Sequence, residues 1–302
     1  MAIRTVGVLG AGIMGHGIAQ VCATSGLDVV LRDVARAPLD SALAKIEQSL
    51  SKFAEKGALS PDRARAARER IRATTDLAEA AETDFVIEAV PENLELKRAV
   101  FRELDSLAPP GTLFASNTSQ FTIASLAVAV RRKDRFIGMH WFNPPQVMAL
   151  IEIARIPETS EATLRATLEL TKRLEKDPVV CKDSKGFITT RAINAFRLEC
   201  FRIWEEGVAS PEDIDKAIRL AFRHPMGPFE LADLVGLDTA LAVEESLAET
   251  YGERFKPPEA LRRLVKEGNL GRKTGQGFYK HEPPSTQPRS AGRNARIEGA
   301  SK

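Results

Sequence analysis

The stretch from residue 4 to residue 33 constrains the fold more than any other part of the chain. An apolar run leads into a glycine-rich turn, a helical run, and a second apolar run that ends in an acid. This order predicts a βαβ unit that binds a dinucleotide. The glycines allow a tight turn, close approach of the pyrophosphate and close packing of the helix on the strand. The residues expected to hold the cofactor phosphates at the helix N-terminus are Gly10, Gly12, Ile13, Met14 and Gly15.

Asp33, the acid that ends the second apolar run, indicates which dinucleotide binds. A carboxylate at this position accepts both ribose hydroxyls of an adenosine and repels a 2′-phosphate. The sequence therefore favours NAD over NADP. Arg32 beside it weakens this preference slightly, and we interpret it as a solvated arginine at the end of a strand.

The composition is that of an ordinary soluble globular protein. The 302 residues suffice for two domains, with 43% apolar and 28% charged residues. A net charge of +2 gives no electrostatic footprint for nucleic acid, and no apolar run approaches the roughly 20 residues that span a bilayer. The three cysteines form no metal or disulfide pattern, and the N-terminus leads almost directly into the first strand. We expect a cytoplasmic protein with no metal, no membrane partner and no nucleic-acid partner.

The first part of the chain alternates strands with helices. Apolar runs predict strands at 5–9, 28–33, 84–90, 111–117, 135–142 and 149–153. Helical patterns fall at 16–25, at 36–72 with a break near 57–61, and at 91–107. Such alternation is typical of an α/β fold with a doubly wound, Rossmann-type, mainly parallel sheet. We place this dinucleotide-binding domain at 1–183.

The character of the sequence changes near residue 183, beyond which no convincing strand is found. Helices are predicted at 186–206, 211–223, 229–251 and 258–267, and a glycine-rich segment closes the domain at 271–280. We expect an all-helical domain at 184–281 for substrate binding and dimerisation. From 282 to 302 the chain is rich in Pro, Ser, Arg and Gly and predicts a disordered tail.

Two residues of the first domain suggest acid–base chemistry. His140 ends an apolar strand, where ligands of open α/β sheets bind, and Glu152 lies within the apolar run 149–153. A buried carboxylate is costly unless it is paired, and a carboxylate that holds an imidazole fixes its tautomer and raises its basicity. Oxidation of a secondary alcohol needs such a base. Taken alone, a histidine at a strand end is more often structural.

Several motifs together resemble one family. They are Gly10-Ala-Gly-Ile-Met-Gly15-His-Gly-Ile-Ala, Ala115-Ser-Asn-Thr-Ser119, Gly138-Met-His140-Trp-Phe-Asn143-Pro, His224-Pro-Met-Gly-Pro-Phe-Glu-Leu and Gly271-Arg-Lys-Thr-Gly-Gln-Gly-Phe-Tyr279. The chain resembles the short L-3-hydroxyacyl-CoA dehydrogenases, most closely the bacterial 3-hydroxybutyryl-CoA dehydrogenases, from residue 3 to residue 280. The resemblance implies reversible NAD-dependent oxidation of (S)-3-hydroxyacyl-CoA to 3-oxoacyl-CoA, as in fatty-acid β-oxidation, by a homodimer.

The resemblance also implies roles for particular residues. His140 is the general base, Glu152 its orienting partner, and Ser119 a hydrogen-bond donor to the reacting oxygen. Asn117 and Asn143 match contacts near the nicotinamide and the substrate carbonyl, although turn formation alone would explain both. The further cofactor contacts implied are Glu92, Lys97 and Lys273, each of which alone would be interpreted as a solvated charge. The implied coenzyme A contacts are Ser49, Lys52 and Lys56.

The sequence departs from the family pattern in four places. Gln120 stands where the family has serine, Trp141 where it has phenylalanine, and Ala149 where it has lysine. Most important, the family's active-site asparagine falls on Thr190. Asn194 lies one helical turn further on the same face. We hypothesise that Thr190 or Asn194 fills the substrate-binding role.

Two alternatives stay open at the level of the sequence. One is a dehydrogenase of the same fold that acts on a sugar acid such as L-gulonate, because fold does not fix substrate. Lys52 and Lys56 favour coenzyme A over this alternative, since lysine suits phosphate as a point charge. The other is a catalytically silent NAD-binding structural protein. The joint presence of His140, Glu152 and Ser119 argues against it.

Overall fold

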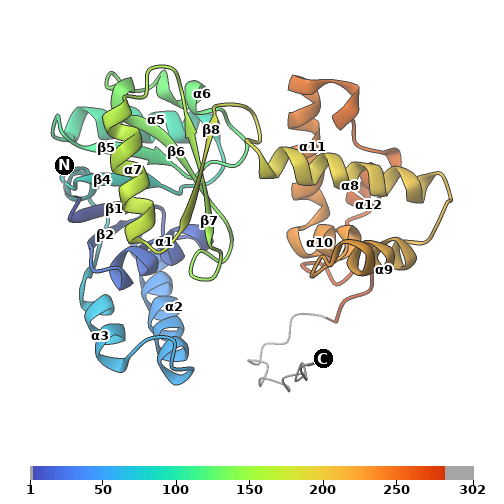
Figure 1. Cartoon of the computed structure of the whole chain (residues 1–302), viewed down its shortest axis with the longest axis horizontal. Coiled ribbons are helices and arrows are strands. Elements are labelled where there is room, and N and C mark those ends of the chain that lie inside the picture. Colours follow the sequence, from blue (N-terminus) through green and yellow to red (C-terminus); the bar gives the residue numbers. More distant parts are fainter. Residues whose placement is uncertain (1–2, 283–302) are drawn as a thin grey trace, which may run out of the picture. The chain divides into compact units, whose positions relative to one another are not determined.

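The structure is a computed structural model that describes residues 3–282 (Figure 1). All but the first residue of the predicted tail 282–302 lies outside the described residues. The chain divides into two compact units, the first extending to Arg191 and the second starting at Ala192. Each unit is described below by itself.

The first unit is built on a sheet of eight strands in the order β3-β2-β1-β4-β5-β6-β7-β8. The strands are β1 Thr5–Leu9, β2 Asp28–Arg32, β3 Ile71–Thr74, β4 Phe85–Glu88, β5 Leu113–Ser116, β6 Phe136–Trp141, β7 Leu150–Arg155 and β8 Asp177–Lys182. Neighbouring strands are parallel except β6 and β7, which run antiparallel. The predicted doubly wound, mainly parallel sheet is confirmed, and β1 and β4 flank the point where the strand order reverses.

Helices cover both faces of this sheet. They are α1 Ile13–Thr24, α2 Arg36–Glu55, α3 Pro61–Glu69, α4 Leu77–Ala81, α5 Leu94–Leu107, α6 Ile123–Ala127 and α7 Glu161–Arg173, with a short 3-10 helix at Lys133–Arg135. Apolar residues of α1, α2, α3 and α7 form one core with the sheet, and those of α4, α5 and α6 form the other. Strand β4 shows the reason: Phe85 and Ile87 enter the first core, while Val86 between them enters the second.

Two strands were not predicted, and each has a physical reason. The break predicted near 57–61 is confirmed, and Gly57 there has φ +69°. Strand β3 falls at the end of the predicted helical stretch 36–72, which is wrong there because α3 ends at Glu69. Strand β8 lies at the edge of the sheet, where Val179 and Val180 remain exposed and the apolar pattern is lost. An edge position also tolerates Pro178, since proline cannot donate to a central ladder.

The second unit is helical, as predicted. Its helices are α8 Thr189–Glu205, which begins in the first unit, α9 Pro211–Phe222, α10 Pro228–Val235, α11 Leu237–Tyr251 and α12 Glu259–Lys266, with a 3-10 helix at Glu253–Phe255. The single helix predicted at 229–251 is wrong, because Gly236 (φ +104°) divides it into α10 and α11. The predicted closing segment is tied to α10: the carboxylate of Asp233 accepts the backbone N–H groups of Phe278 and Tyr279 at 2.9 Å each.

Over residues 3–282, no helix combines the length and apolar character needed to cross a membrane. The same residues contain no group of three or more His, Cys, Asp or Glu side chains placed to hold a metal ion.

Candidate active site

His140 and Glu152 meet because β6 and β7 are antiparallel and place the two residues directly opposite each other. Opposed residues of an antiparallel pair project from the same face of the sheet. His140 Nδ1 lies 2.7 Å from Glu152 Oε2, with the histidine 6% exposed and the glutamate fully buried. The structure thus brings together the two side chains that the sequence suggests as a pair.

Glu152 is ionised in its buried position because donors surround it. Its Oε1 accepts the backbone N–H groups of Ile188 (3.2 Å) and Thr189 (2.8 Å), and its Oε2 accepts the Thr189 hydroxyl (3.0 Å). Burial alone would raise the pKa of Glu152. The hydrogen bonds from His140 and Thr189, with the charge of His140, outweigh burial and hold that pKa below 4.5. The sequence assigned the next residue, Thr190, to substrate binding, and only the fold reveals that Thr189 contacts Glu152.

The imidazole of His140 is oriented for proton transfer. Because an ionised carboxylate only accepts hydrogen bonds, Nδ1 carries a proton and donates its N–H to Glu152 Oε2. In the neutral imidazole the other nitrogen, Nε2, is then an acceptor. Nε2 has no hydrogen-bond partner among residues 3–282. The rings of Phe142 and Phe187 lie 4.6 and 5.7 Å from the imidazole. An imidazole that lies beside apolar rings and has one unbonded acceptor nitrogen is suited to remove a proton from an alcohol.

The glycine-rich turn has the geometry of a phosphate cradle. Gly10 has φ +97°, and a Cβ atom on Gly15 would lie 1.7 Å from the carbonyl oxygen of Gly10. A Cβ atom on Gly12 would meet nothing within 4 Å, so it would extend into the open space before α1. Gly10 and Gly15 therefore maintain the turn, while Gly12 keeps the N-terminus of α1 accessible to a phosphate.

Asp33 lies beside this turn. Its Oδ2 accepts the backbone N–H of Ala11 and its Oδ1 that of Val34, each at 2.7 Å. Both neighbouring arginines already have partners: Arg32 Nε donates to Thr75 O (3.4 Å) and Arg36 Nε to Asp40 (2.9 Å). These contacts direct neither Arg32 nor Arg36 at a 2′-phosphate, which fits NAD better than NADP. The exposed apolar side chain of Val34, which follows Asp33, was not predicted from the sequence.

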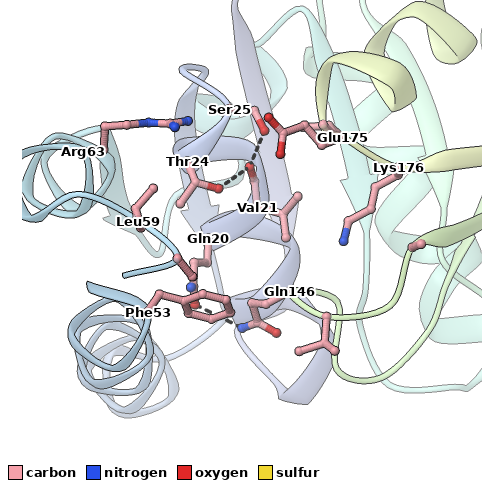
Figure 2. A pocket seen from close by; sticks show the side chains of 14 residues that line it. Gln20, Val21, Thr24, Ser25, Phe53, Leu59, Arg63, Gln146, Glu175 and Lys176 are labelled. Atoms are coloured by element: carbon pink, nitrogen blue, oxygen red, sulfur yellow. Dashed lines mark hydrogen bonds between the residues drawn. The ribbon is translucent and has the colours of Figure 1, made fainter. Parts of the chain in front are cut away.

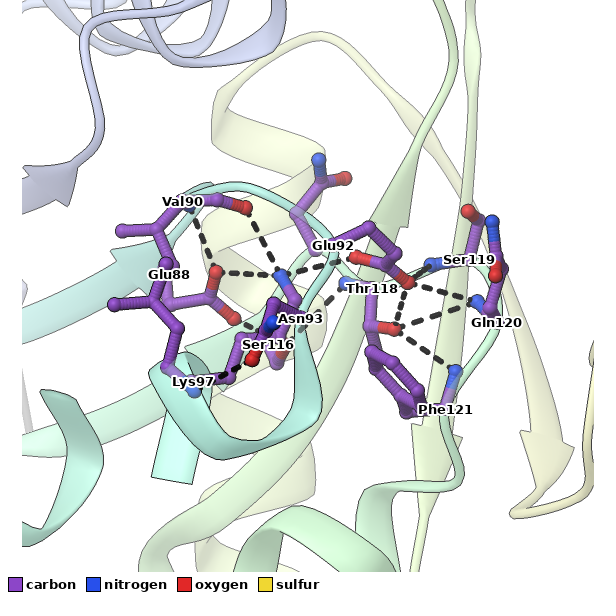
Figure 3. A network of polar contacts seen from close by, with 12 residues as sticks. Glu88, Val90, Glu92, Asn93, Lys97, Ser116, Thr118, Ser119, Gln120 and Phe121 are labelled. Carbon is purple, nitrogen blue, oxygen red and sulfur yellow. Dashed lines mark hydrogen bonds and ion pairs between the residues drawn. The ribbon is translucent and has the colours of Figure 1, made fainter. Parts of the chain in front are cut away.

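A buried ionic network lies at the carboxyl end of β4 (Figure 3). Lys97, on α5, is 1% exposed, and its Nζ lies 2.6 Å from Glu88 Oε1, 3.1 Å from Glu92 Oε2 and 3.2 Å from the carbonyl oxygen of Val90. Interpreted alone, Lys97 was a solvated helix charge, and this is wrong. An ammonium group has three donors, and here each has an acceptor.

Glu92 connects this network to Ser119. Its Oε1 accepts the hydroxyl of Thr118 and the backbone N–H groups of Ser119 (3.1 Å) and Gln120 (3.0 Å), which follow β5 (Figure 3). The two carboxylates and Lys97 thereby fix the loop that carries Ser119. The Ser119 side chain is half-buried and its hydroxyl has no partner among the described residues.

The remaining predicted residues have varied environments. Asn117 Oδ1 accepts the backbone N–H of Trp141 at 2.8 Å, which ties the ends of β5 and β6 together. Asn143 is exposed and precedes a cis-proline, Pro144. In the second unit, Lys273 forms an ion pair with Asp238, and Asn194 is buried and accepts a hydrogen bond from Arg197. This contact favours a structural role for Asn194.

A cavity of about 290 Å³ lies beside α1 (Figure 2). Helix α2 contributes Phe53, and α3 contributes Arg63. Phe53 and Lys176 lie on opposite sides of the cavity in the view of Figure 2. The predicted coenzyme A contacts Ser49, Lys52 and Lys56 do not line the cavity. The lining residues are Gln20, Val21, Thr24, Ser25, Phe53, Ala58, Leu59, Arg63, Gln146, Val147, Ala149, Leu174, Glu175 and Lys176.

The chain matches two family models and several known proteins. The model described as "3-hydroxyacyl-CoA dehydrogenase, NAD binding domain" matches residues 5–184, and the model described as "3-hydroxyacyl-CoA dehydrogenase, C-terminal domain" matches residues 186–281. The chain is 45% identical over 276 residues to a probable 3-hydroxybutyryl-CoA dehydrogenase of Deinococcus radiodurans, covering 91% of this chain and 99% of that relative. It is 43% identical over 288 residues to the mitochondrial hydroxyacyl-coenzyme A dehydrogenase of Homo sapiens, covering 93% and 92%.

Solved structures agree with these matches. The crystal structure of (S)-3-hydroxybutyryl-CoA dehydrogenase PaaH1 from Ralstonia eutropha is similar with a TM-score of 0.90 and 42% identity, covering 93% of this chain and 100% of that one. The resemblance drawn from the motifs is thereby confirmed. The dinucleotide cradle, the α/β sheet and the helical unit all fall within the matched residues, and the chain belongs to the 3-hydroxyacyl-CoA dehydrogenase family of oxidoreductases.

Proposed function

We propose that this enzyme catalyses the reversible NAD-dependent oxidation of (S)-3-hydroxyacyl-CoA to 3-oxoacyl-CoA, with 3-hydroxybutyryl-CoA as its substrate. The observation that carries the proposal is the His140–Glu152 pair with an open Nε2. It lies at the carboxyl edge of a sheet whose β1 leads into a phosphate cradle. This combination supplies a base for the hydroxyl proton and a site for the hydride acceptor.

His140 acts as the general base. Its Nε2 takes the hydroxyl proton, and Glu152, bonded to Nδ1, stabilises the imidazolium that forms. When bound, NAD accepts the hydride from C3 of the substrate. In the reverse direction, the protonated His140 donates to the carbonyl oxygen. Ser119 donates a hydrogen bond to the same oxygen from the loop that Glu92 fixes, and Asn143 lies next to the reacting centre.

The cofactor is held by two kinds of contact. Backbone groups at the start of α1 bind the pyrophosphate and Asp33 binds the adenosine ribose, supported by the open space at Gly12 and the engaged arginines. Asn117, Glu92, Lys97 and Lys273 complete the proposed set. For Lys97 the geometry supports an indirect contribution through Glu92, because its donors already have acceptors.

Coenzyme A binds along α2 in this proposal. The lysines Lys52 and Lys56 are exposed and Ser49 is half-exposed, so all three are available to phosphate. Phe53 lies between them in sequence and offers a ring to the adjoining cavity, which suits the adenine of coenzyme A. Thr190 and Asn194 are the proposed substrate contacts of α8, and Asn194 also accepts a hydrogen bond from Arg197.

We further propose a cytoplasmic homodimer that pairs through the helical unit. The support is the exposed apolar surface of α9, where Leu220 and Phe222 are 73% and 63% exposed. Large apolar side chains gathered at one helix end are typical of an interface. Fatty-acid β-oxidation, butanoate metabolism and aromatic-acid breakdown all use this step.

The test is NADH oxidation by the purified protein with acetoacetyl-CoA, free acetoacetate, and a panel of sugar acids. We expect rapid oxidation with the thioester alone. In His140→Gln, kcat should fall by about 10²–10⁴ while NADH binding is kept. Activity with a sugar acid but not with the thioester would contradict the substrate assignment. NADH binding without turnover of any of these substrates would instead indicate a catalytically silent NAD-binding protein.

A further inference from the structure

The carboxylate oxygen that holds the proposed catalytic histidine is shared with a second donor. Glu152 Oε2 accepts both His140 Nδ1 at 2.7 Å and the Thr189 hydroxyl at 3.0 Å. The other oxygen accepts only backbone N–H groups, those of Ile188 and Thr189. Any non-proline residue at 188 and 189 would provide those backbone donors. Of the three contacts that residues 188 and 189 make to Glu152, only the one from the Thr189 hydroxyl depends on which side chain is present.

The position of Thr189 is fixed by the start of α8. Thr189 is the first residue of that helix, where backbone N–H groups have no acceptor within the helix. Glu152 on β7 accepts one of these N–H groups, that of Thr189. This hydrogen bond fixes both the start of α8 and the position of the carboxylate. Gly186 and Phe187 just before it have positive φ angles of 75° and 43°. This bend directs the first residues of α8 toward Glu152.

We propose that Thr189 is a positioning residue for the reaction: its hydroxyl competes with His140 for Glu152 Oε2 and thereby sets how strongly the carboxylate stabilises the protonated imidazole. The proposal rests on the proposed role of His140 as general base. A hydroxyl that donates to the carboxylate withdraws part of its negative charge. The imidazolium is then stabilised less, and neutral His140, the form that accepts a proton from the alcohol, persists to lower pH. Without the hydroxyl, the carboxylate would stabilise the imidazolium more strongly.

Few other ionisable groups act on this pair. From β8, Cys181 faces it, and burial, together with the charges of Glu152 and Asp183, raises the pKa of that thiol to about 11, so it stays neutral. Asp183 itself accepts the backbone N–H groups of Ile123 and Ala124 at 2.8 Å each. The neighbouring rings, Phe142 just after β6 and Phe187 just before α8, carry no charge. A change in the titration of the pair can thus be assigned to the Thr189 hydroxyl.

The experiment compares three variants of the full chain. Thr189→Val keeps the backbone donor and the shape but removes the hydroxyl, and Thr189→Ser restores a hydroxyl. Thr171→Val is the matched control, since Thr171 is a buried threonine of the same unit whose hydroxyl bonds a backbone carbonyl, that of Thr167, at 2.8 Å. The readouts are the pH profile of kcat/KM for oxidation of (S)-3-hydroxybutyryl-CoA and, independently of activity, the NMR titration of the His140 ring.

We expect the acid limb of the Thr189→Val profile to move to higher pH by about half a unit, which is about threefold in kcat/KM on that limb. The ring titration should move in the same direction, and Thr189→Ser and Thr171→Val should match the wild type. An unmoved acid limb and an unmoved ring titration in Thr189→Val would overturn the proposal. So would a uniform loss at all pH values that Thr171→Val shares, because this indicates packing alone.

The two hypotheses can fail separately. If the wild type does not oxidise the thioester, the proposed function fails, and the NMR titration still measures whether the hydroxyl acts on the pair. If the wild type is active but neither midpoint moves, only the role of Thr189 fails.

Discussion

Lys97 and Glu88 form an ion pair of 2.6 Å in which both side chains are almost completely buried. Burial raises the pKa of Glu88 above 4.5, and the charge and hydrogen bond of Lys97 act against this rise. Ser116 Oγ donates to the second carboxylate oxygen at 2.6 Å, so every polar atom of the pair is occupied. Each member of such a pair therefore depends on the other.

Replacing Lys97 with methionine should lower the free energy of unfolding by about 3–5 kcal/mol, because it leaves Glu88 buried without a cation. The measurement is chemical unfolding at neutral pH. The double variant Lys97→Met/Glu88→Gln should recover much of the loss. Arg65→Met, which breaks only an exposed pair with Asp62, should change stability by less than about 0.5 kcal/mol.

The loss in Lys97→Met should depend on pH in a defined direction. In the folded protein the pKa of the Glu88 carboxyl is higher than in the unfolded chain. Such a group favours the folded state most at pH values below the unfolded-state pKa, and this contribution is lost as pH rises through the folded-state pKa. The variant should therefore regain stability as pH falls toward about 4. A destabilisation independent of pH would show that Glu88 does not take up the proton.

Gly12→Ala and Gly15→Ala should separate the cofactor site from the fold. The new Cβ atom of Gly15→Ala would lie 1.7 Å from Gly10 O, so this variant should lose both thermal stability and NADH binding. The Cβ atom of Gly12→Ala meets no protein atom, so its melting temperature should match the wild type while NADH affinity falls. Melting curves and NADH titration distinguish the two. Unchanged NADH affinity in Gly12→Ala would place the pyrophosphate elsewhere.

Phe53→Leu should weaken binding of the nucleotide end of coenzyme A. We expect a several-fold higher KM for acetoacetyl-CoA, because a stacking ring contributes about 1 kcal/mol. The KM for acetoacetyl-N-acetylcysteamine, a thioester without the nucleotide, should not change. Lys45→Gln, on the exposed side of α2 and outside the cavity, is the control. An equal rise in KM for both thioesters would show that Phe53 acts on something other than the nucleotide.

Asp105 should contribute to stability only above acidic pH. Burial would raise its pKa, but hydrogen bonds from Arg131 and Arg132 outweigh burial and hold that pKa below 3.8. A carboxylate whose folded-state pKa is lowered stabilises the fold above its unfolded pKa, and the effect is lost as pH falls through the folded pKa. Asp105→Asn should therefore cost about 2 kcal/mol at neutral pH, and this cost should shrink as pH falls below about 4. Denaturant midpoints at several pH values test this, and an equal cost at every pH would contradict it.

The strands that carry the sheet core could be predicted because their signal is local. A continuous apolar run such as 84–90 reflects a strand that is buried on both faces of the sheet. Strands of a parallel sheet covered by helices on both faces generally show this run of apolar residues. Strand β8 could not be predicted, because four of its six residues are exposed at the sheet edge. The helix break at Gly236 also escaped prediction, since a glycine alone does not reveal whether φ will be positive.

The sequence alone determined the dinucleotide unit, the two-part architecture and the residue types of the His140–Glu152 pair. These features follow from patterns among residues close in the chain, or from a glycine that a particular backbone geometry requires. The tertiary structure decided which side chains meet. His140 faces Glu152 because β6 and β7 are antiparallel in one register. Thr189 reaches Glu152 because α8 begins there, and Lys97 is buried because α5 packs over the end of β4. These contacts join residues that lie 9, 12 and 37 positions apart in the chain, and no local sequence pattern reports contacts between residues so far apart.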